Sequence, residues 1–208
     1  YPQDVGGHTV YRCSGQAVTE RLGKEAWFVE TLRRELAEGR NVLVFLWHKE
    51  LAARLRLLCA DAGVDDAVVL DANKVPARKR QDWIDKYVVS QRKRVLITNP
   101  TCVQTGLNNL IHFSTAIFFE NPGCSPFVAR QAVGRLDRIT QTKEVRIYWP
   151  VYAGVQCALL DLLQNKTAIS QQIDGIDPTA ALEMAGGGEA TAQSLDVGMA
   201  VYKYLGGE

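Results

Sequence analysis

The chain has 208 residues, of which 47% are hydrophobic and 23% are charged, an ordinary composition for a globular protein with one sizeable core. Lys and Arg number 24 against 23 for Asp and Glu, so the net charge of +1 neither favours nor excludes nucleic acid as a partner. Five irregularly spaced cysteines exclude a disulfide framework and a zinc signature and indicate a reducing, cytoplasmic setting, and no apolar run approaches the ~18 residues that a membrane span requires.

Helix-like and strand-like patterns alternate from about residue 24 to residue 174. Residues 24–39 carry apolar side chains at the spacing of an amphipathic helix and end on a glycine. The continuous apolar run at 41–46 is typical of a buried parallel strand. Further helices are predicted at 49–60, 76–89, from Ser125 onward and at 153–173, and further strands at 66–70, 94–98, 115–119 and 144–149.

This alternation predicts an α/β fold, in which a parallel sheet carries helices on both faces and ligands bind at the carboxyl ends of the strands. We expect residues 1–23 to be an extended lead-in and 24–175 to be the folded domain. Residues 176–208 are expected to be an extension with a flexible link at 185–188 and a short helix at 195–205. Because the chain begins at Tyr1 and not at Met, we expect it to be a fragment of a longer protein.

The segment from Ser125 to Lys143 contains the most informative pattern. On a continuous helix, Gln131, Gly134, Arg135 and Arg138 would share one face, at i, i+3, i+4 and i+7. Such a stripe is commonly a solvated charged surface. Alternatively, the glycine permits close approach of a ligand, and the two guanidiniums can bind a triphosphate and stabilise the charge that moves during phosphoryl transfer. The pattern alone leaves both interpretations open.

Residues 131–145, Q-A-V-G-R-L-D-R-I-T-Q-T-K-E-V, resemble motif VI of superfamily 2 helicases, Q-x-x-G/D-R-x-x-R, in the R-I-x-Q-T-K form typical of Swi/Snf-type ATPases. Other elements match that family in the same order: motif IV at 42–45, an R-x-x-x-I element at Arg80–Ile84, and the G-L-N core of motif V within 105–108. Residues 119–121 and 125–126 stand where the family usually has Y-D and N-P. Two departures are the Val103–Gln104 pair, where a Gly-Gly is usual, and Thr140, where the family usually has glycine.

The resemblance implies a RecA-like parallel sheet, the second of two such domains in a P-loop ATPase. Arg135 and Arg138 would be catalytic arginine fingers that reach the γ-phosphate of an ATP–Mg²⁺ held mainly by the N-terminal RecA-like domain of the same protein. The resemblance also implies that four residues lie at the bound nucleotide: Gln131, Gly134, Gly106 and Asn108. It places Thr101 and Thr105 on the nucleic-acid backbone. Separately from the resemblance, the Trp47–His48 pair just beyond the first strand either packs against the core or contacts nucleic acid, by stacking on a base or by binding a phosphate.

Neither a G-x-x-x-x-G-K-[ST] loop nor a D-E-x-H stretch is found in the sequence. Both belong to the first RecA-like domain in the family that the chain resembles, so we expect this domain to be inactive alone. The favoured function is that of an ATP-driven translocase on double-stranded DNA, with strand separation as an alternative. A non-catalytic scaffold that binds protein or nucleic acid is a second alternative. An unrelated α/β enzyme, such as a nucleotide-sugar transferase, would not explain the ordered motifs.

Overall fold

The computed structural model describes residues 2–5, 8–11, 21–103, 107, 109–120 and 126–173. The first two segments are strands β1 (Pro2–Val5) and β2 (His8–Tyr11), which pair antiparallel as a hairpin. The sequence pattern predicts an extended segment here but not the pairing. The predicted extension at 176–208 lies outside the described residues.

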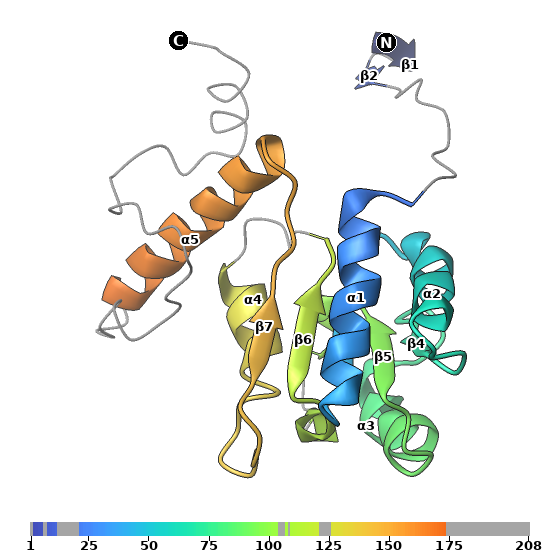
Figure 1. Cartoon of the computed structure of the whole chain (residues 1–208). Coiled ribbons are helices and arrows are strands. Elements are labelled where there is room, and N and C mark those ends of the chain that lie inside the picture. The colour runs from blue at the N-terminus through green and yellow to red at the C-terminus, as the bar shows by residue number, and fades with distance from the viewer. Residues whose placement is uncertain are drawn as a thin grey trace.

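Five strands form one parallel sheet in the order β4-β5-β3-β6-β7. In Figure 1, β6 and β7 lie side by side and α1 stands in front of the sheet. Every residue of β3, β5 and β6 is buried, as expected for inner strands that helices cover on both faces. All five lie within the ranges predicted from the apolar runs. Their bounds are β3 Val42–Phe45, β4 Val68–Leu70, β5 Val95–Thr98, β6 Thr115–Phe118 and β7 Arg146–Tyr148.

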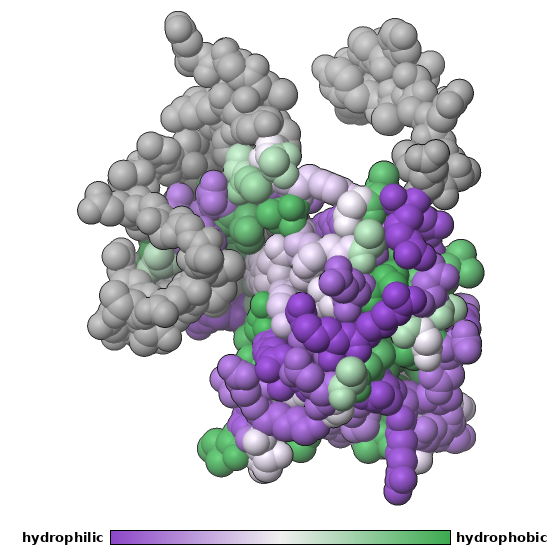
Figure 2. Space-filling model, in the orientation of Figure 1, coloured by the Kyte–Doolittle hydropathy of each residue, from purple (hydrophilic) through white to green (hydrophobic). Residues whose placement is uncertain are grey.

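Two helices, α1 (Gly23–Ala37) and α2 (Leu51–Asp61), cover one face of the sheet and share a core with alternate strand residues such as Val42 and Val44. The buried side of α1 carries Phe28, Val29, Leu32 and Leu36, while mainly hydrophilic residues lie over its outward side (Figure 2). This division follows from the amphipathic spacing of the sequence.

The other face of the sheet is covered by short elements packed on Leu43, Phe45 and Leu96. They are α3, the 3₁₀ segments η3 and η4, and α4, against which the long helix α5 packs. The predicted α/β architecture with helices on both faces is therefore confirmed. The bounds of these elements are α3 Arg80–Ile84, η3 Pro100–Val103, η4 Asn109–His112, α4 Pro126–Val133 and α5 Val155–Ile173. None of the described helices combines the length and the apolar character that a membrane span needs.

The helix predicted at 76–89 is present but divided. A 3₁₀ turn η1 (Ala77–Lys79) leads into α3, and a π-helical turn η2 (Asp85–Val89) ends the segment. The side-chain amide of Asn109 donates to the Gln81 carbonyl, at 3.0 Å, and to the Asp85 carboxylate, at 2.9 Å. This contact ties α3 and η2 to η4, a long-range constraint that the helical periodicity does not contain.

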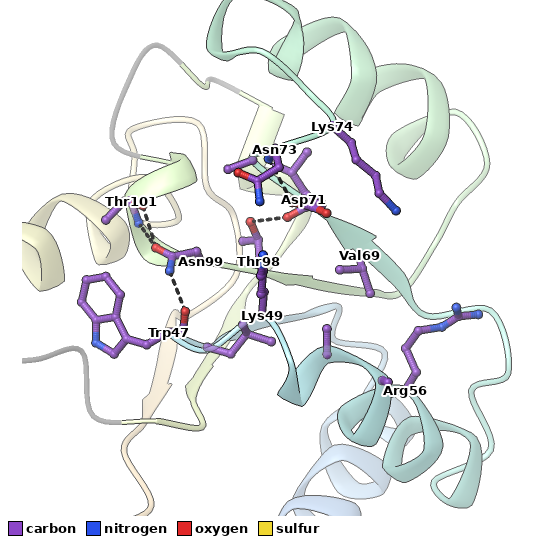
Figure 3. Close-up of a pocket in the computed structure, with 15 residues that line it drawn as sticks. Trp47, Lys49, Arg56, Val69, Asp71, Asn73, Lys74, Thr98, Asn99 and Thr101 are labelled. Carbon is purple, nitrogen blue, oxygen red and sulfur yellow. Dashed lines mark hydrogen bonds between the residues drawn. The ribbon is translucent and has the colours of Figure 1, made fainter. Parts of the chain in front are cut away.

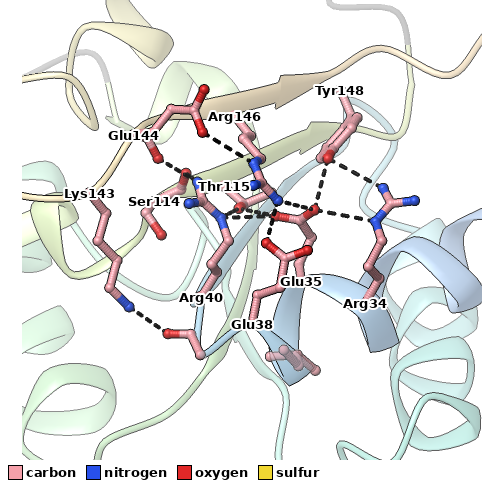
Figure 4. Close-up of polar contacts among 12 residues, drawn as sticks. Arg34, Glu35, Glu38, Arg40, Ser114, Thr115, Lys143, Glu144, Arg146 and Tyr148 are labelled. Carbon is pink, nitrogen blue, oxygen red and sulfur yellow. Dashed lines mark hydrogen bonds and ion pairs between the residues drawn. The ribbon is translucent and has the colours of Figure 1, made fainter.

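A buried ionic cluster joins the end of α1 to the starts of β6 and β7 (Figure 4). The Glu35 carboxylate is fully buried and accepts from Thr115 Oγ1 at 2.8 Å and Tyr148 OH at 2.8 Å. It also pairs with Arg40, 3.0 Å away, and Arg146, 3.3 Å away. Burial alone would raise the pKa of Glu35, but the hydrogen bonds from Tyr148 and Thr115 and the charge of Arg146 outweigh it and lower that pKa.

Candidate functional site

The segment that resembles motif VI begins on α4 and continues into a series of turns. The helix ends at Val133, and beyond it the Gly134 amide donates to the Arg130 carbonyl at 2.9 Å and the Leu136 amide to the Val133 carbonyl at 2.9 Å. The prediction that Gln131, Gly134, Arg135 and Arg138 share one helical face is therefore wrong. Two physical reasons apply: glycine disfavours helix continuation, and Leu136 is fully buried, which anchors the turn to the sheet.

Arg138 contacts the segment that resembles motif V. Its Nη2 donates to the carbonyl of Leu107 at 3.3 Å, and both Arg135 and Arg138 are partly buried. Two motifs that lie about 30 residues apart in the chain thus meet on the face of the sheet that α4 covers. Gln131 is also partly buried, on α4 itself. Three other predicted site residues, Thr105, Gly106 and Asn108, lie outside the described residues.

A cavity of about 460 Å³ opens at the carboxyl ends of β3, β4 and β5 (Figure 3). Its lining includes three cationic side chains, Lys49, Arg56 and Lys74, and one carboxylate, Asp71. The predicted residue Thr101 also lines it, while none of the three cations was singled out by the sequence patterns. Positions just after a strand are the signal that points to Lys49 and Lys74, because ligands of open parallel sheets bind at that edge.

Hydrogen bonds hold the loops around this cavity in place. Thr101 donates to the Asn99 side-chain oxygen from both its amide, at 2.9 Å, and its hydroxyl, at 2.7 Å. The Asn99 amide group in turn donates to the Trp47 carbonyl at 3.2 Å, which links the loop after β5 to the loop after β3. The cavity therefore offers fixed polar groups beside an excess of positive charge, which suits a phosphate-bearing ligand.

His48 lies at the same edge and is paired with Glu120, which follows β6. Glu120 accepts from the amides of Trp47, at 2.7 Å, and His48, at 2.9 Å, and its other oxygen lies 2.5 Å from His48 Nδ1. The hydrogen bond and negative charge of Glu120 raise the pKa of His48, whose side chain is 75% exposed. Glu120 occupies the position of the aspartate in the Y-D element of the Swi/Snf-type family that the sequence resembles. The sequence analysis predicts no function for Glu120. Charge, exposure and position make His48 available to an anionic ligand.

Comparisons with known proteins bear on the fold. No protein-family model matches the sequence, and no curated protein matches it. The structure is similar to the C-terminal part of the Fun30 ATPase domain, with a TM-score of 0.59 and 23% identity over 68% of this chain and 45% of that one. It is also similar to the Sulfolobus solfataricus SWI2/SNF2 ATPase core in complex with dsDNA, with a TM-score of 0.55 and 20% identity over 76% of this chain and 33% of that one. The chain spans less than half of the length of either structure. These similarities show the fold alone: a RecA-like parallel sheet with helices on both faces, as the sequence resemblance implies.

Proposed function

We propose that this RecA-like domain is the C-terminal motor domain of a nucleic-acid-dependent ATPase of the Swi/Snf type. The observation that carries the proposal is the contact of Arg138 with the Leu107 carbonyl. It joins the arginine-bearing segment to the segment that resembles motif V, in a domain with the fold of Swi2/Snf2-type ATPases. A scaffold domain has no need for two arginines beside such a junction.

In this proposal ATP and Mg²⁺ are held mainly by an N-terminal RecA-like domain of the same protein. Among the described residues, no three His, Cys, Asp or Glu side chains gather where they could hold a metal. Arg135 and Arg138 supply positive charge to the γ-phosphate as it transfers. The nucleotide side of the site is completed by Gln131, Gly134, Gly106 and Asn108. The domain alone would not hydrolyse ATP.

The cavity at the carboxyl edge is proposed to bind the nucleic-acid backbone. Lys49, Arg56, Lys74 and Thr101, which line the cavity, would contact phosphates. Thr105 and His48 are proposed as further phosphate contacts. Contacts of this kind fix the position of a duplex without reading its bases, which suits a motor that moves along any sequence. Double-stranded DNA is the favoured partner, because one structure of similar fold is of a complex with dsDNA.

The first test is ATP turnover by the full-length protein with duplex DNA, single-stranded DNA, RNA or no nucleic acid. Turnover that rises with one of these identifies a nucleic-acid-dependent motor and its substrate. If no nucleic acid changes the turnover, the motor proposal is wrong and the scaffold interpretation takes its place.

Replacement of Lys49 and Lys74 together by alanine is expected to weaken duplex binding and to reduce its salt dependence. Each lost phosphate contact lowers the slope of log affinity against log salt by about 0.9, so the double variant should lose about 1–2 in slope. Fluorescence anisotropy over a salt series measures this slope. Lys86→Ala is the matched control, because Lys86 is exposed on η2 and does not line the cavity. Equal slopes for the wild type and the double variant would refute the cavity as the phosphate site.

Duplex binding is also expected to weaken as the pH rises through the raised pKa of His48. Below that pKa the imidazolium pairs with Glu120 through Nδ1 and keeps a second N–H that can donate to a phosphate. Above it the ring is neutral, so the ion pair and the attraction to phosphate are both lost. The His48→Gln variant should therefore show a flatter dependence of affinity on pH above the ordinary histidine pKa of about 6.5. A variant with the same pH dependence as the wild type would exclude His48 as the group responsible.

A further inference from the structure

Gln141 makes an unusually large set of contacts for a side chain in a surface turn. Its amide nitrogen lies within hydrogen-bonding distance of three backbone carbonyls, those of Leu136 at 3.2 Å, Ile111 at 3.1 Å and Phe113 at 3.0 Å. Its side-chain oxygen accepts from the Lys143 amide at 3.1 Å, so both ends of the amide group are used. The side chain is partly buried. Gln141 therefore holds the turn after α4 against the segment around η4.

The same two segments meet at a second point. Arg138 Nη2 donates to the carbonyl of Leu107, just before η4, whereas Gln141 contacts the carbonyls of Ile111 and Phe113, at its end and just after it. The backbone N–H of Gln141 also donates to the backbone carbonyl of Arg138 at 2.7 Å, which closes the turn between the two residues. The arginine side chain is thus positioned from both sides, by the turn that carries it and by the segment that it contacts.

The two short elements η3 and η4 each also bond to the region of α3. Arg80 donates to the carbonyls of Cys102, at 3.1 Å, and Val75, at 3.2 Å. Asn109 donates to Gln81 and Asp85, as described above. Thr101 of η3 lines the cavity, whereas Leu107 and the end of η4 are held by Arg138 and Gln141.

We propose that Gln141 is a positioning residue that sets the placement of Arg138 at the ATP by holding the turn after α4 against η4. The inference rests on the proposed motor function. An uncharged amide suits the role, because it donates to the carbonyls of Ile111 and Phe113 while its oxygen accepts from Lys143. Glutamate in its place would present only acceptors to those carbonyls, and methionine would fill the space without donating to them.

The test compares the full-length wild type with Gln141→Met, Gln141→Asn and Gln156→Met. Gln156 is the matched control, since it is also partly buried and also bonds a backbone amide, that of Tyr152 at 3.1 Å, but lies on α5 away from both segments. ATP turnover is measured with and without linear duplex DNA, together with the KM for ATP, the Kd for the duplex and the thermal unfolding midpoint. Gln141→Asn keeps the side-chain amide but shortens the side chain by one methylene, so it serves as the conservative variant.

Gln141→Met is expected to lower duplex-stimulated kcat by about 10- to 100-fold, the size of effect that a misplacement of about 1 Å produces. The KM for ATP and the Kd for the duplex should stay within about twofold of the wild-type values. Gln141→Asn should be intermediate and Gln156→Met normal. Stimulation by the duplex in Gln141→Met equal to that of the wild type, or an equal loss in Gln156→Met, would overturn the inference while the motor function stands. A wild type that the duplex does not stimulate would instead overturn the motor function on which the inference rests.

Discussion

Replacement of Arg138 by alanine in the full-length protein is expected to lower nucleic-acid-stimulated ATP turnover by about 10³- to 10⁵-fold, the usual effect of removing an arginine finger. The physical reason is that the transferring phosphoryl group spreads negative charge over its oxygens, and a guanidinium held at a fixed place stabilises that charge without reorganisation. The guanidinium of Arg138 is held in this way, because its Nη2 donates a hydrogen bond to the Leu107 carbonyl. Binding of ATP should change far less than turnover, since most contacts to ATP belong to the other domain in this proposal.

Two further variants make this test specific. Arg138→Lys keeps the positive charge but loses the planar fork, so it should recover only a small part of the turnover. Arg130→Ala is the control, because Arg130 is an exposed arginine on α4, outside the proposed machinery. ATP affinity and the unfolding midpoint are measured in parallel, so that a folding defect is recognised. Turnover that survives the loss of Arg138 would show that the arginine-finger assignment is wrong and would move the assignment to Arg135.

Replacement of Glu35 by alanine is expected to lower the free energy of unfolding by about 3–5 kcal/mol, the range for removing one partner of a buried ionic cluster. The loss is large because Arg40, whose side chain is only 7% exposed, keeps its charge in the interior with no carboxylate beside it. Arg40 also donates to the carbonyls of Ser114 and Glu144, so its displacement would disturb the starts of β6 and β7. Urea denaturation followed by circular dichroism measures the change.

Glu38→Ala is the matched control for this variant. Glu38 is also a glutamate near the end of α1 and pairs with Arg146 at 2.6 Å, but its side chain is 43% exposed. Exposed pairs contribute only about 0–1 kcal/mol, so the two alanine variants should differ by at least about 2 kcal/mol. Equal losses in the two variants would mean that the burial of Glu35 does not determine its contribution.

The buried carboxylate also predicts a pH dependence of stability. The pKa of Glu35 is lowered in the folded protein, so its contribution is fully present above the ordinary glutamate pKa and is lost as the pH falls through the lowered value. The wild type should therefore lose stability in the acid range below about pH 4, and Glu35→Ala should lose less over the same range. Unfolding curves at a series of pH values measure this difference, and parallel losses in the two proteins would exclude Glu35 as its source.

The sequence by itself determined the strands of the sheet and the longer helices of this domain. The apolar runs at 42–45, 95–98 and 115–118 have to be buried on both sides, and only strands between two helical layers provide that burial. The spacing of apolar residues on α1 likewise requires a helix with one buried side. The identity of the fold followed from the order of the motifs and is confirmed by the structural similarities. The roles of Arg135 and Arg138 stay predictions.

Only the tertiary structure decided which segments meet. The π-helical turn and the contacts of Arg138 and Gln141 depend on residues about 20 or more positions away. The end of α4 at Val133 depends in part on the burial of Leu136. The three cations that line the cavity, Lys49, Arg56 and Lys74, also depend on the tertiary structure. They line one cavity only once the strands are ordered β4-β5-β3. The periodicity of apolar residues indicates which side of a helix or strand is buried. It does not contain the order of strands in the sheet, and that order brings distant loops to one edge.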